Sequence, residues 1–176
     1  HELIKVAKTQ GDYQVDITNE ESIKALFEKV GRVDGIISVT GNLHFSPISE
    51  MTGQGFNIGL NDKLLGQVNL ALIGQNYLNE GGSITLTSGI VSQQPIKGGT
   101  NASTVNAALE GFVKSAAIEL KNGQRINAIS PSVVTESLDV YGPFFPGYEP
   151  VSAQRVAMAF QRSIEGGLTG QTFNVW

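Results

Sequence analysis

The stretch Thr18–Val39, TNEESIKALFEKVGRVDGIISV, sets a helix directly before a strand. Thr18–Glu21 has the form of a capping box, in which side chains bond the first free N–H groups of a helix. The apolar residues that follow at helical spacing are Ile23, Leu26, Phe27 and Val30. Gly31 ends this helix, and Val33–Val39 is apolar without alternation, as strands covered on both faces are. The stretch therefore predicts an amphipathic helix and then a buried strand of a parallel sheet.

The same order of strand and helix continues through the chain. Further strands are predicted at Leu3–Ala7, Tyr13–Ile17, Ser83–Thr87, Arg125–Ile129 and Thr172–Trp176. Further helices are predicted at Phe56–Leu78, Ser103–Leu120 and Val151–Ile164. Strands and helices that alternate with short connections predict one Rossmann-like α/β domain over residues 1–176, with a doubly wound parallel sheet. Ligands of such sheets bind beyond the carboxyl ends of the strands, so site residues are expected there.

Composition and charge limit the classes of function. With 176 residues, 40% of them hydrophobic and 16% charged, the chain is long enough for one domain with a sizeable core. Its net charge of −4, without a run of Lys or Arg, predicts no nucleic-acid partner and no membrane partner. The lack of cysteine and of a long apolar run favours a cytoplasmic protein. The start at His1, without an initiator Met or a signal peptide, indicates the interior of a longer chain.

Five segments, in order along nearly the whole chain, resemble motifs of the short-chain dehydrogenase/reductase superfamily. They are Asp16–Thr18, Asp34–Gly41, Gly81–Ser88, Ile126–Pro131 and Thr169–Thr172. The resemblance implies that Leu3–Ala7 corresponds to the second strand of the family fold. The first strand, the Gly-rich phosphate turn and the first helix are therefore expected to be absent from this chain.

The resemblance also implies a dinucleotide cofactor and a small-molecule substrate. Lys8 follows the strand where the family chooses between cofactors, and a basic residue there favours NADP, with NAD as the alternative. The residues that the resemblance places at the cofactor are Lys8, Asp16, Ile17, Thr40, Gly41, Asn106, Pro131 and Val134. His44 is an isolated loop histidine, so no metal site is expected.

The catalytic motif of the family is altered. The family carries Tyr-x-x-x-Lys on the helix predicted at Ser103–Leu120 and just before it, and here Ala102 and Asn106 take those two positions. Ser88 falls at the catalytic Ser position and Lys63 at a position where the family usually has Asn. Ser88 then binds a substrate carbonyl or only caps a turn, and Lys63 carries a proton or is only a solvated helix residue.

The sequence leaves three hypotheses for the function open. The resemblance implies an NADP- or NAD-dependent reductase of a small carbonyl compound, or a pseudoenzyme that binds nucleotide without turnover, or a truncated piece that binds none. The family also assembles through two helices, which correspond here to Phe56–Leu78 and Ser103–Leu120, so a homodimer or homotetramer is expected. The aromatic loop Tyr141–Pro150 is expected to form a lid or a subunit contact.

Overall fold

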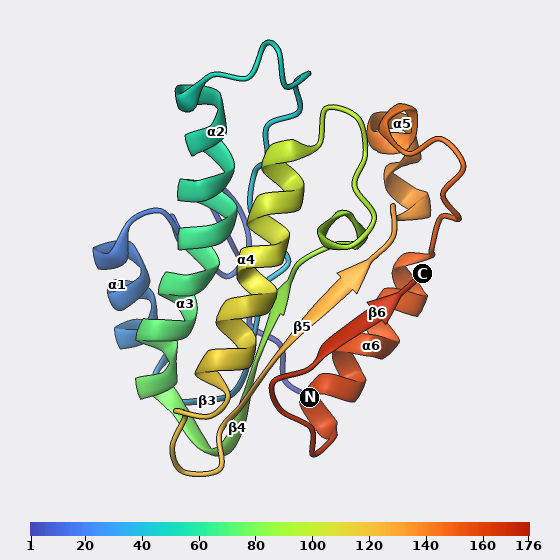
Figure 1. The fold of residues 1–176 in the computed structure, drawn as a ribbon. Helices are drawn as coiled ribbons and strands as arrows, with labels where there is room; N and C mark the ends of the chain where they lie inside the picture. The colour runs from blue at the N-terminus through green and yellow to red at the C-terminus, as the bar shows by residue number, and fades with distance from the viewer.

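A four-stranded parallel sheet forms the centre of the computed structural model, which describes residues 1–176 (Figure 1). Its strands are β3 (Val33–Ile37), β4 (Leu78–Thr87), β5 (Arg125–Pro131) and β6 (Thr172–Val175), side by side in that order. Each neighbouring pair is parallel. A parallel order of this kind requires a crossover between strands, which the helices supply.

A second parallel sheet contains only β1 (Val6–Ala7) and β2 (Tyr13–Gln14). Both strands lie where the sequence predicted them but are much shorter, and they form a sheet of their own beside β3. The outer edge of β3 has no strand partner, and its Ile37 is 44% exposed. The prediction of a parallel α/β fold without its first strand–turn–helix unit is confirmed.

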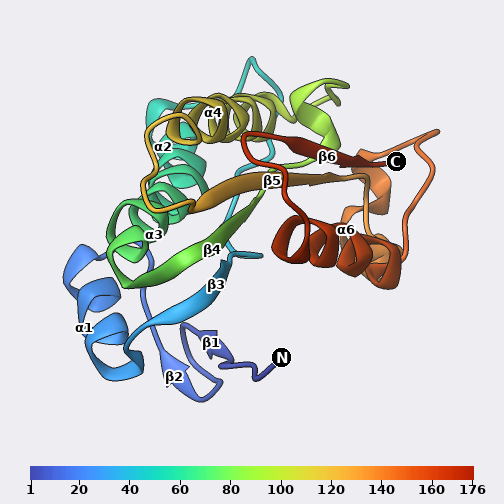
Figure 2. The ribbon, with the colours of Figure 1, turned by 90° about the horizontal axis from the view of Figure 1, so that it is seen from below.

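Helices cover both faces of the larger sheet. The helical segments are α1 (Glu20–Val30), α2 (Gly53–Gly59), η1 (Leu60–Leu65), α3 (Gly66–Gly74), η2 (Gln75–Tyr77), η3 (Ile90–Ser92), α4 (Thr100–Ala116), η4 (Thr135–Ser137), α5 (Leu138–Tyr141), η5 (Gly142–Phe144) and α6 (Ala153–Glu165). Figure 2 shows α2, α3 and α4 on one side of the sheet and α6 on the other, with α1 beside α3. In this doubly wound arrangement, the helical layer on one face of the sheet is therefore larger than the layer on the other face. None of these helices has the length and apolar character needed to cross a membrane.

The helix α1 forms as the sequence predicted, with one correction at its start. Ile23, Leu26 and Phe27 are buried, as their spacing indicated. The cap is Asn19, whose side chain accepts hydrogen bonds from two backbone N–H groups of the first turn. Thr18 does not cap the helix, because its hydroxyl instead donates to Asp16 at 2.7 Å.

The long helix predicted at Phe56–Leu78 is in fact three consecutive segments, α2, η1 and α3, followed by the short turn η2. It begins at Gly53 because Thr52 caps it, and its middle segment η1 is a π-helix. Wide turns of this kind occur often at functional sites. Leu78 belongs to β4, which starts five residues earlier than the predicted strand Ser83–Thr87.

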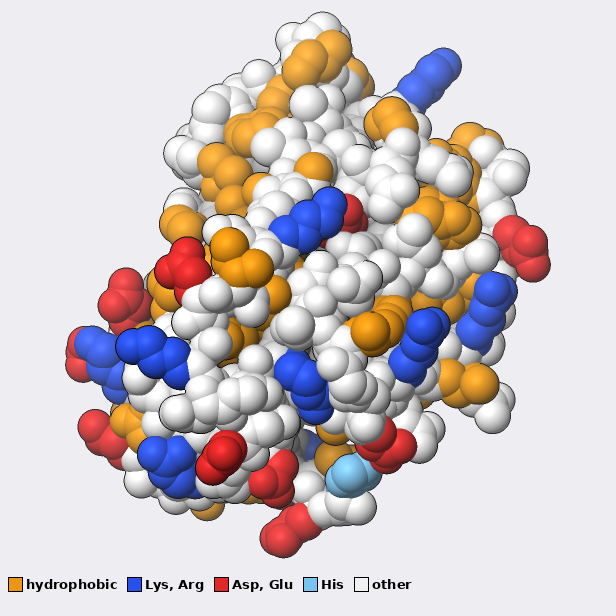
Figure 3. Space-filling model, turned by 60° about the horizontal axis from the view of Figure 1, so that its bottom comes forward, with side chains coloured by type: hydrophobic (Ala, Val, Ile, Leu, Met, Phe, Trp, Pro, Cys, Tyr) orange, Lys and Arg blue, Asp and Glu red, His pale blue; other side chains and the backbone are white.

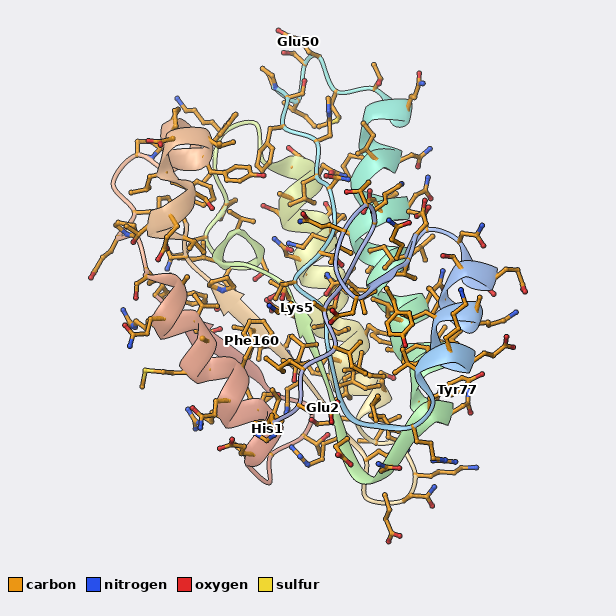
Figure 4. The ribbon with its side chains drawn as sticks, turned by 180° about the vertical axis from the view of Figure 1, so that it is seen from behind. His1, Glu2, Lys5, Glu50, Tyr77 and Phe160 are labelled. Atoms are coloured by element: carbon orange, nitrogen blue, oxygen red, sulfur yellow. The ribbon has the colours of Figure 1, made fainter.

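Two of the three hydrophobic clusters hold the layers together. The larger one lies between the sheet and the helices α1, α3 and α4, and includes Ile84, Leu86, Val105, Leu109, Ile126 and Ala128. The smaller one lies under α6 and contains Ile129, Val151, Phe160, Phe173 and Val175. Figure 4 labels Phe160 on α6 and Tyr77, whose ring stacks on Phe27 at 5.1 Å.

The chain ends and the surface add little that bears on a site. His1 lies beside the end of α6, where its Nε2 is 2.9 Å from Glu165 Oε1 (Figure 4). On the face seen in Figure 3, Lys and Arg side chains are interspersed with Asp and Glu.

Candidate active site

A cavity of about 240 Å³ lies at the carboxyl ends of β4 and β5. One wall comes from α4 and another from the segments that follow the two strands. The polar and small residues of its lining include Gly41, Lys63, Ser88, Gly89, Ala102, Asn106, Pro131 and Val134. Most of the residues that the sequence placed at the nicotinamide end or in catalysis therefore meet at one cavity, where ligands of such sheets bind.

Lys63 is buried in this cavity, since only 9% of the residue is exposed. Its Nζ donates a hydrogen bond to the backbone carbonyl of Ser88 at 3.1 Å, and no carboxylate forms an ion pair with it. Burial without a counter-charge lowers the pKa of Lys63 from 10.5 to about 8. The alternative of a solvated helix lysine is therefore wrong, and the π-helix η1 carries an amine that titrates near neutral pH.

The hydroxyl of Ser88 is engaged inside the protein. Its Oγ donates to Glu110 Oε1 at 2.9 Å, and the Oγ of Ser92 donates to the same oxygen at 2.6 Å. The carboxylate of Glu110, on α4, therefore accepts hydrogen bonds from both ends of the turn that follows β4. The Ser88 hydroxyl is therefore part of a buried hydrogen-bond network, and its expected role in binding a substrate carbonyl stays a prediction.

Sequence reasoning missed Glu110, although a signal was present. The residue sits on α4 between Leu109 and Val113, both fully buried, and is itself only 8% exposed. A carboxylate next to the apolar stripe of a helix needs hydrogen-bond donors, because an unpaired buried charge is very costly. Serines after the preceding strand were the available donors.

Asn106 presents an unsatisfied polar group to the cavity. Only 2% of the residue is exposed, and its Oδ1 has no hydrogen-bond partner. A buried acceptor without a donor costs about 1–3 kcal/mol, so such a group indicates a place for a ligand donor. Gly89 faces it, and a Cβ at Gly89 would lie 3.1 Å from Asn106 Nδ2. Together with the buried methyl of Ala102, these residues leave space and no titratable group on this wall.

The loop after β3 closes over Lys63. Gly41 has a φ of 118°, and a Cβ there would lie 2.5–2.7 Å from the Cα, Cβ and Cγ of Lys63. Only glycine fits both the left-handed backbone and the close contact. Its neighbour Thr40 is exposed and its hydroxyl lies 3.0 Å from that of Ser38.

The residues expected at the adenine end of a cofactor lie outside the cavity lining. Lys8 Nζ is 2.8 Å from Asp16 Oδ2, and Asp16 Oδ1 also accepts two hydrogen bonds from Thr18. The bond from Lys8, with those from Thr18, lowers the pKa of Asp16 to about 2. The same bond raises the pKa of Lys8. Ile17, by contrast, is buried and packs against Gly66.

Aromatic rings surround the mouth of the cavity. The ring of Phe45 lies 6.2 Å from that of Tyr141 and 4.9 Å from that of Phe144. Phe45, Tyr141 and Phe145 all line the cavity. The aromatic loop therefore contributes to the wall of the site, which supports the lid interpretation of this loop.

A parallel sheet between helical layers, with a cavity at its carboxyl edge, is typical of Rossmann-like α/β proteins. Comparison with known families agrees, because a family model described as Enoyl-(Acyl carrier protein) reductase matches residues 1–162. The chain belongs to this family, within the short-chain dehydrogenase/reductase superfamily, and the resemblance noted from the sequence is confirmed.

Individual relatives share the fold over most of the chain. The protein lin1944 from Listeria innocua is 47% identical with a TM-score of 0.98, over 99% of this chain and 88% of that one. A small-chain dehydrogenase solved in complex with NADPH is 29% identical with a TM-score of 0.82, over 92% of this chain and 80% of that one. Hydroxynaphthalene reductase arp2 from Aspergillus fumigatus is 29% identical over 130 residues, which are 71% of this chain and 48% of that protein. The chain spans about half the length of the curated relatives it matches.

Proposed function

We propose that the protein is an NADP-dependent oxidoreductase that reduces a small carbonyl compound, with NAD as the alternative cofactor. The observation that carries the proposal is the buried amine of Lys63 in the cavity at the carboxyl edge of the sheet. The relatives support it, since one is named a reductase and another was solved with NADPH. Cytoplasmic placement and a homo-oligomer stay predictions from the sequence.

The cavity residues fit the nicotinamide end of such a cofactor. The unpaired Oδ1 of Asn106 can accept a hydrogen bond from a ribose hydroxyl. Thr40, Gly41, Pro131 and Val134 would complete this end of the site. When bound, the cofactor supplies the hydride. Contacts to the pyrophosphate are not assigned, because these 176 residues contain no Gly-rich turn after a first strand.

Lys63 is the proton donor in this proposal. With its pKa lowered to about 8, roughly nine tenths of the amine is protonated at pH 7, and the proton leaves far more readily than from an ordinary lysine. One N–H of the ammonium bonds the carbonyl of Ser88, and the other two remain available to a substrate oxygen. Ala102 and Asn106 cannot transfer a proton, so the wall on α4 supplies no acid or base.

A second candidate is a nucleotide-binding protein without turnover. The observation that favours it is the wall formed by Gly89, Ala102 and Asn106, which has no titratable group. In this case Lys63 serves only as a hydrogen-bond donor to a bound ligand.

Two measurements on the full-length protein separate these functions. Titration of NADPH or of NADH is expected to give a saturable change in cofactor fluorescence, and the absence of a change with both cofactors at millimolar concentration refutes both candidates. A panel of aldehydes and ketones is then tested for NADPH oxidation. Turnover that falls roughly a hundredfold in Lys63→Met supports the reductase. Binding without turnover over the whole panel supports the second candidate.

A further inference from the structure

The cavity holds a lysine that is buried without an acidic partner, and this burial sets Lys63 apart from the other lysines of the chain. Lys8 and Lys24 form ion pairs with Asp16 and Glu21, and both are exposed. The Nζ of Lys63 has a single protein partner, the carbonyl of Ser88. A carbonyl oxygen holds the nitrogen in place without supplying a negative charge. The amine is therefore fixed, desolvated and open to a molecule in the cavity.

We propose that Lys63 captures aldehydes in the cavity as an imine, which makes this residue a covalent binding site. The inference goes beyond the proposed reduction, because it requires only the cavity and the amine and holds whether or not a cofactor is turned over. Desolvated lysines in apolar pockets are the form of this side chain that reacts with carbonyl groups.

The chemistry is complete with the groups present. The lone pair of neutral Nζ attacks the aldehyde carbon, a C–N bond forms, and the carbonyl electron pair moves to the oxygen, which takes up a proton. The resulting carbinolamine loses one water molecule and a proton from nitrogen, which leaves the C=N bond. No oxidant or reductant is needed, and hydrolysis by water reverses the reaction.

The supply of neutral amine favours Lys63 over the exposed lysines. A pKa of about 8 leaves about a tenth of the amine neutral at pH 7. A lysine at its ordinary pKa is neutral in only about one molecule in three thousand at that pH. Lys63 therefore offers a few-hundredfold more nucleophile than an unperturbed surface lysine, before any gain from positioning.

The lining of the cavity selects the class of aldehyde. Lys63 is the sole charged residue of the lining, and once it becomes a neutral amine the cavity offers no cation for a phosphate or carboxylate. The apolar part of the wall includes Leu43, Ile90, Val91 and Phe145. An uncharged aldehyde with a small aromatic or aliphatic body is therefore the expected ligand.

The test uses benzaldehyde with sodium cyanoborohydride, which reduces the imine to a stable secondary amine. Wild-type protein without NADPH is expected to gain one benzyl group on its lysine side chains, located on Lys63 by peptide mapping, with a pH dependence centred on about 8. Labelling of the α-amino group of the chain is counted separately. Lys97→Met removes an exposed lysine and should leave this labelling unchanged. Lys63→Met and Lys63→Arg should abolish it.

Labelling spread evenly over exposed lysines, with no preference for Lys63 at neutral pH, overturns the proposal. Peptide mapping of the wild-type protein decides the matter even if a Lys63 variant does not fold. Because the labelling omits cofactor, its failure is distinct from a failure of NADPH binding, which the fluorescence titration measures separately.

Discussion

Lys8 Nζ lies 2.8 Å from Asp16 Oδ2, so the residue expected to choose between cofactors is paired with a residue expected at the adenine. Asp16 in turn is held by two hydrogen bonds from Thr18. The carboxylate therefore fixes the position of the lysine head group at the surface. A phosphate on the adenine ribose would compete with Asp16 for the same cation.

The first prediction concerns this cation. Lys8→Ala should weaken NADPH binding by roughly three- to tenfold and leave NADH binding unchanged, because only the extra phosphate of NADPH needs a partner. Fluorescence titrations of both cofactors at low salt measure the two dissociation constants. Lys5→Ala removes a neighbouring exposed cation and serves as the control. An equal change for both cofactors would mean that Lys8 does not contact the phosphate.

The fold was largely predictable from the sequence because its signals are local. The cap and apolar spacing of α1 act within a few residues, and this helix forms in place. The prediction of a buried strand at Val33–Val39 is wrong in part, because β3 ends at Ile37 and only its Ile36 is buried. As an edge strand, β3 lacks the cover on both faces that its sequence indicated. The ends of the elements were less predictable. β1 and β2 shrink to two residues each, because strand length depends on neighbouring strands that the sequence does not identify.

The candidate site was predictable only in part. Family motifs indicated that Lys63, Ser88 and Asn106 would come together, and all three line one cavity. The pKa of Lys63 and the hydrogen-bond partner of the Ser88 hydroxyl could not be predicted from these motifs. The lowered pKa of Lys63 results from burial, and the commitment of the Ser88 hydroxyl results from Glu110, which is 22 residues away in the chain. Both depend on tertiary packing.

The second prediction follows from the direction of the Lys63 pKa shift. The unfolded chain binds the proton up to pH of about 10.5 and the folded protein only up to about 8, so stability rises with pH between these values. Below a pH of about 8 the buried cation lowers the free energy of unfolding by up to about 3 kcal/mol. Urea unfolding of wild type at pH about 7 and about 9.5 should show the increase.

Lys63→Met is the matched control for this effect, since it keeps much of the side-chain volume without a charge. Its stability should be at least that of wild type at neutral pH and should lack the rise attributed to Lys63. If the stability of wild type changed with pH over this interval in the same way as that of Lys63→Met, burial of the Lys63 cation would be contradicted.

The third prediction tests the packing of the segment that carries Lys63. A Cβ at Gly66 would lie 2.6 Å from Ile17 Cδ1, so Gly66→Ala forces Ile17 to move and should destabilise the protein by about 1–3 kcal/mol. Gly111→Ala is the matched helical control, because a Cβ there meets nothing within 4 Å. That change should stabilise the protein by roughly 0.5–1 kcal/mol. Equal free energies of unfolding for the two variants would show that α3 does not pack closely on Ile17.

The last prediction concerns the outer face of α2, η1 and α3. Ile58, Leu65 and Leu72 follow one another at seven-residue intervals and are 43%, 47% and 49% exposed. Leu72 also borders a groove of about 170 Å³ between α3 and α4, whose walls include Phe112 and Leu120. Exposed apolar side chains beside an apolar groove are expected where two copies of a chain pack together.

We therefore expect the homodimer or homotetramer that the sequence indicated, with this face at its centre. Leu72→Glu should shift the mass measured by light scattering to that of the monomer at micromolar concentration, because the pairing would bury a charge without a partner. Ile48→Glu introduces the same charge at a residue that is 71% exposed in a loop and should leave the mass unchanged. A wild-type protein that is already monomeric at this concentration would refute the assembly. A Leu72→Glu protein that keeps the wild-type oligomeric mass would place the interface on another face of the molecule.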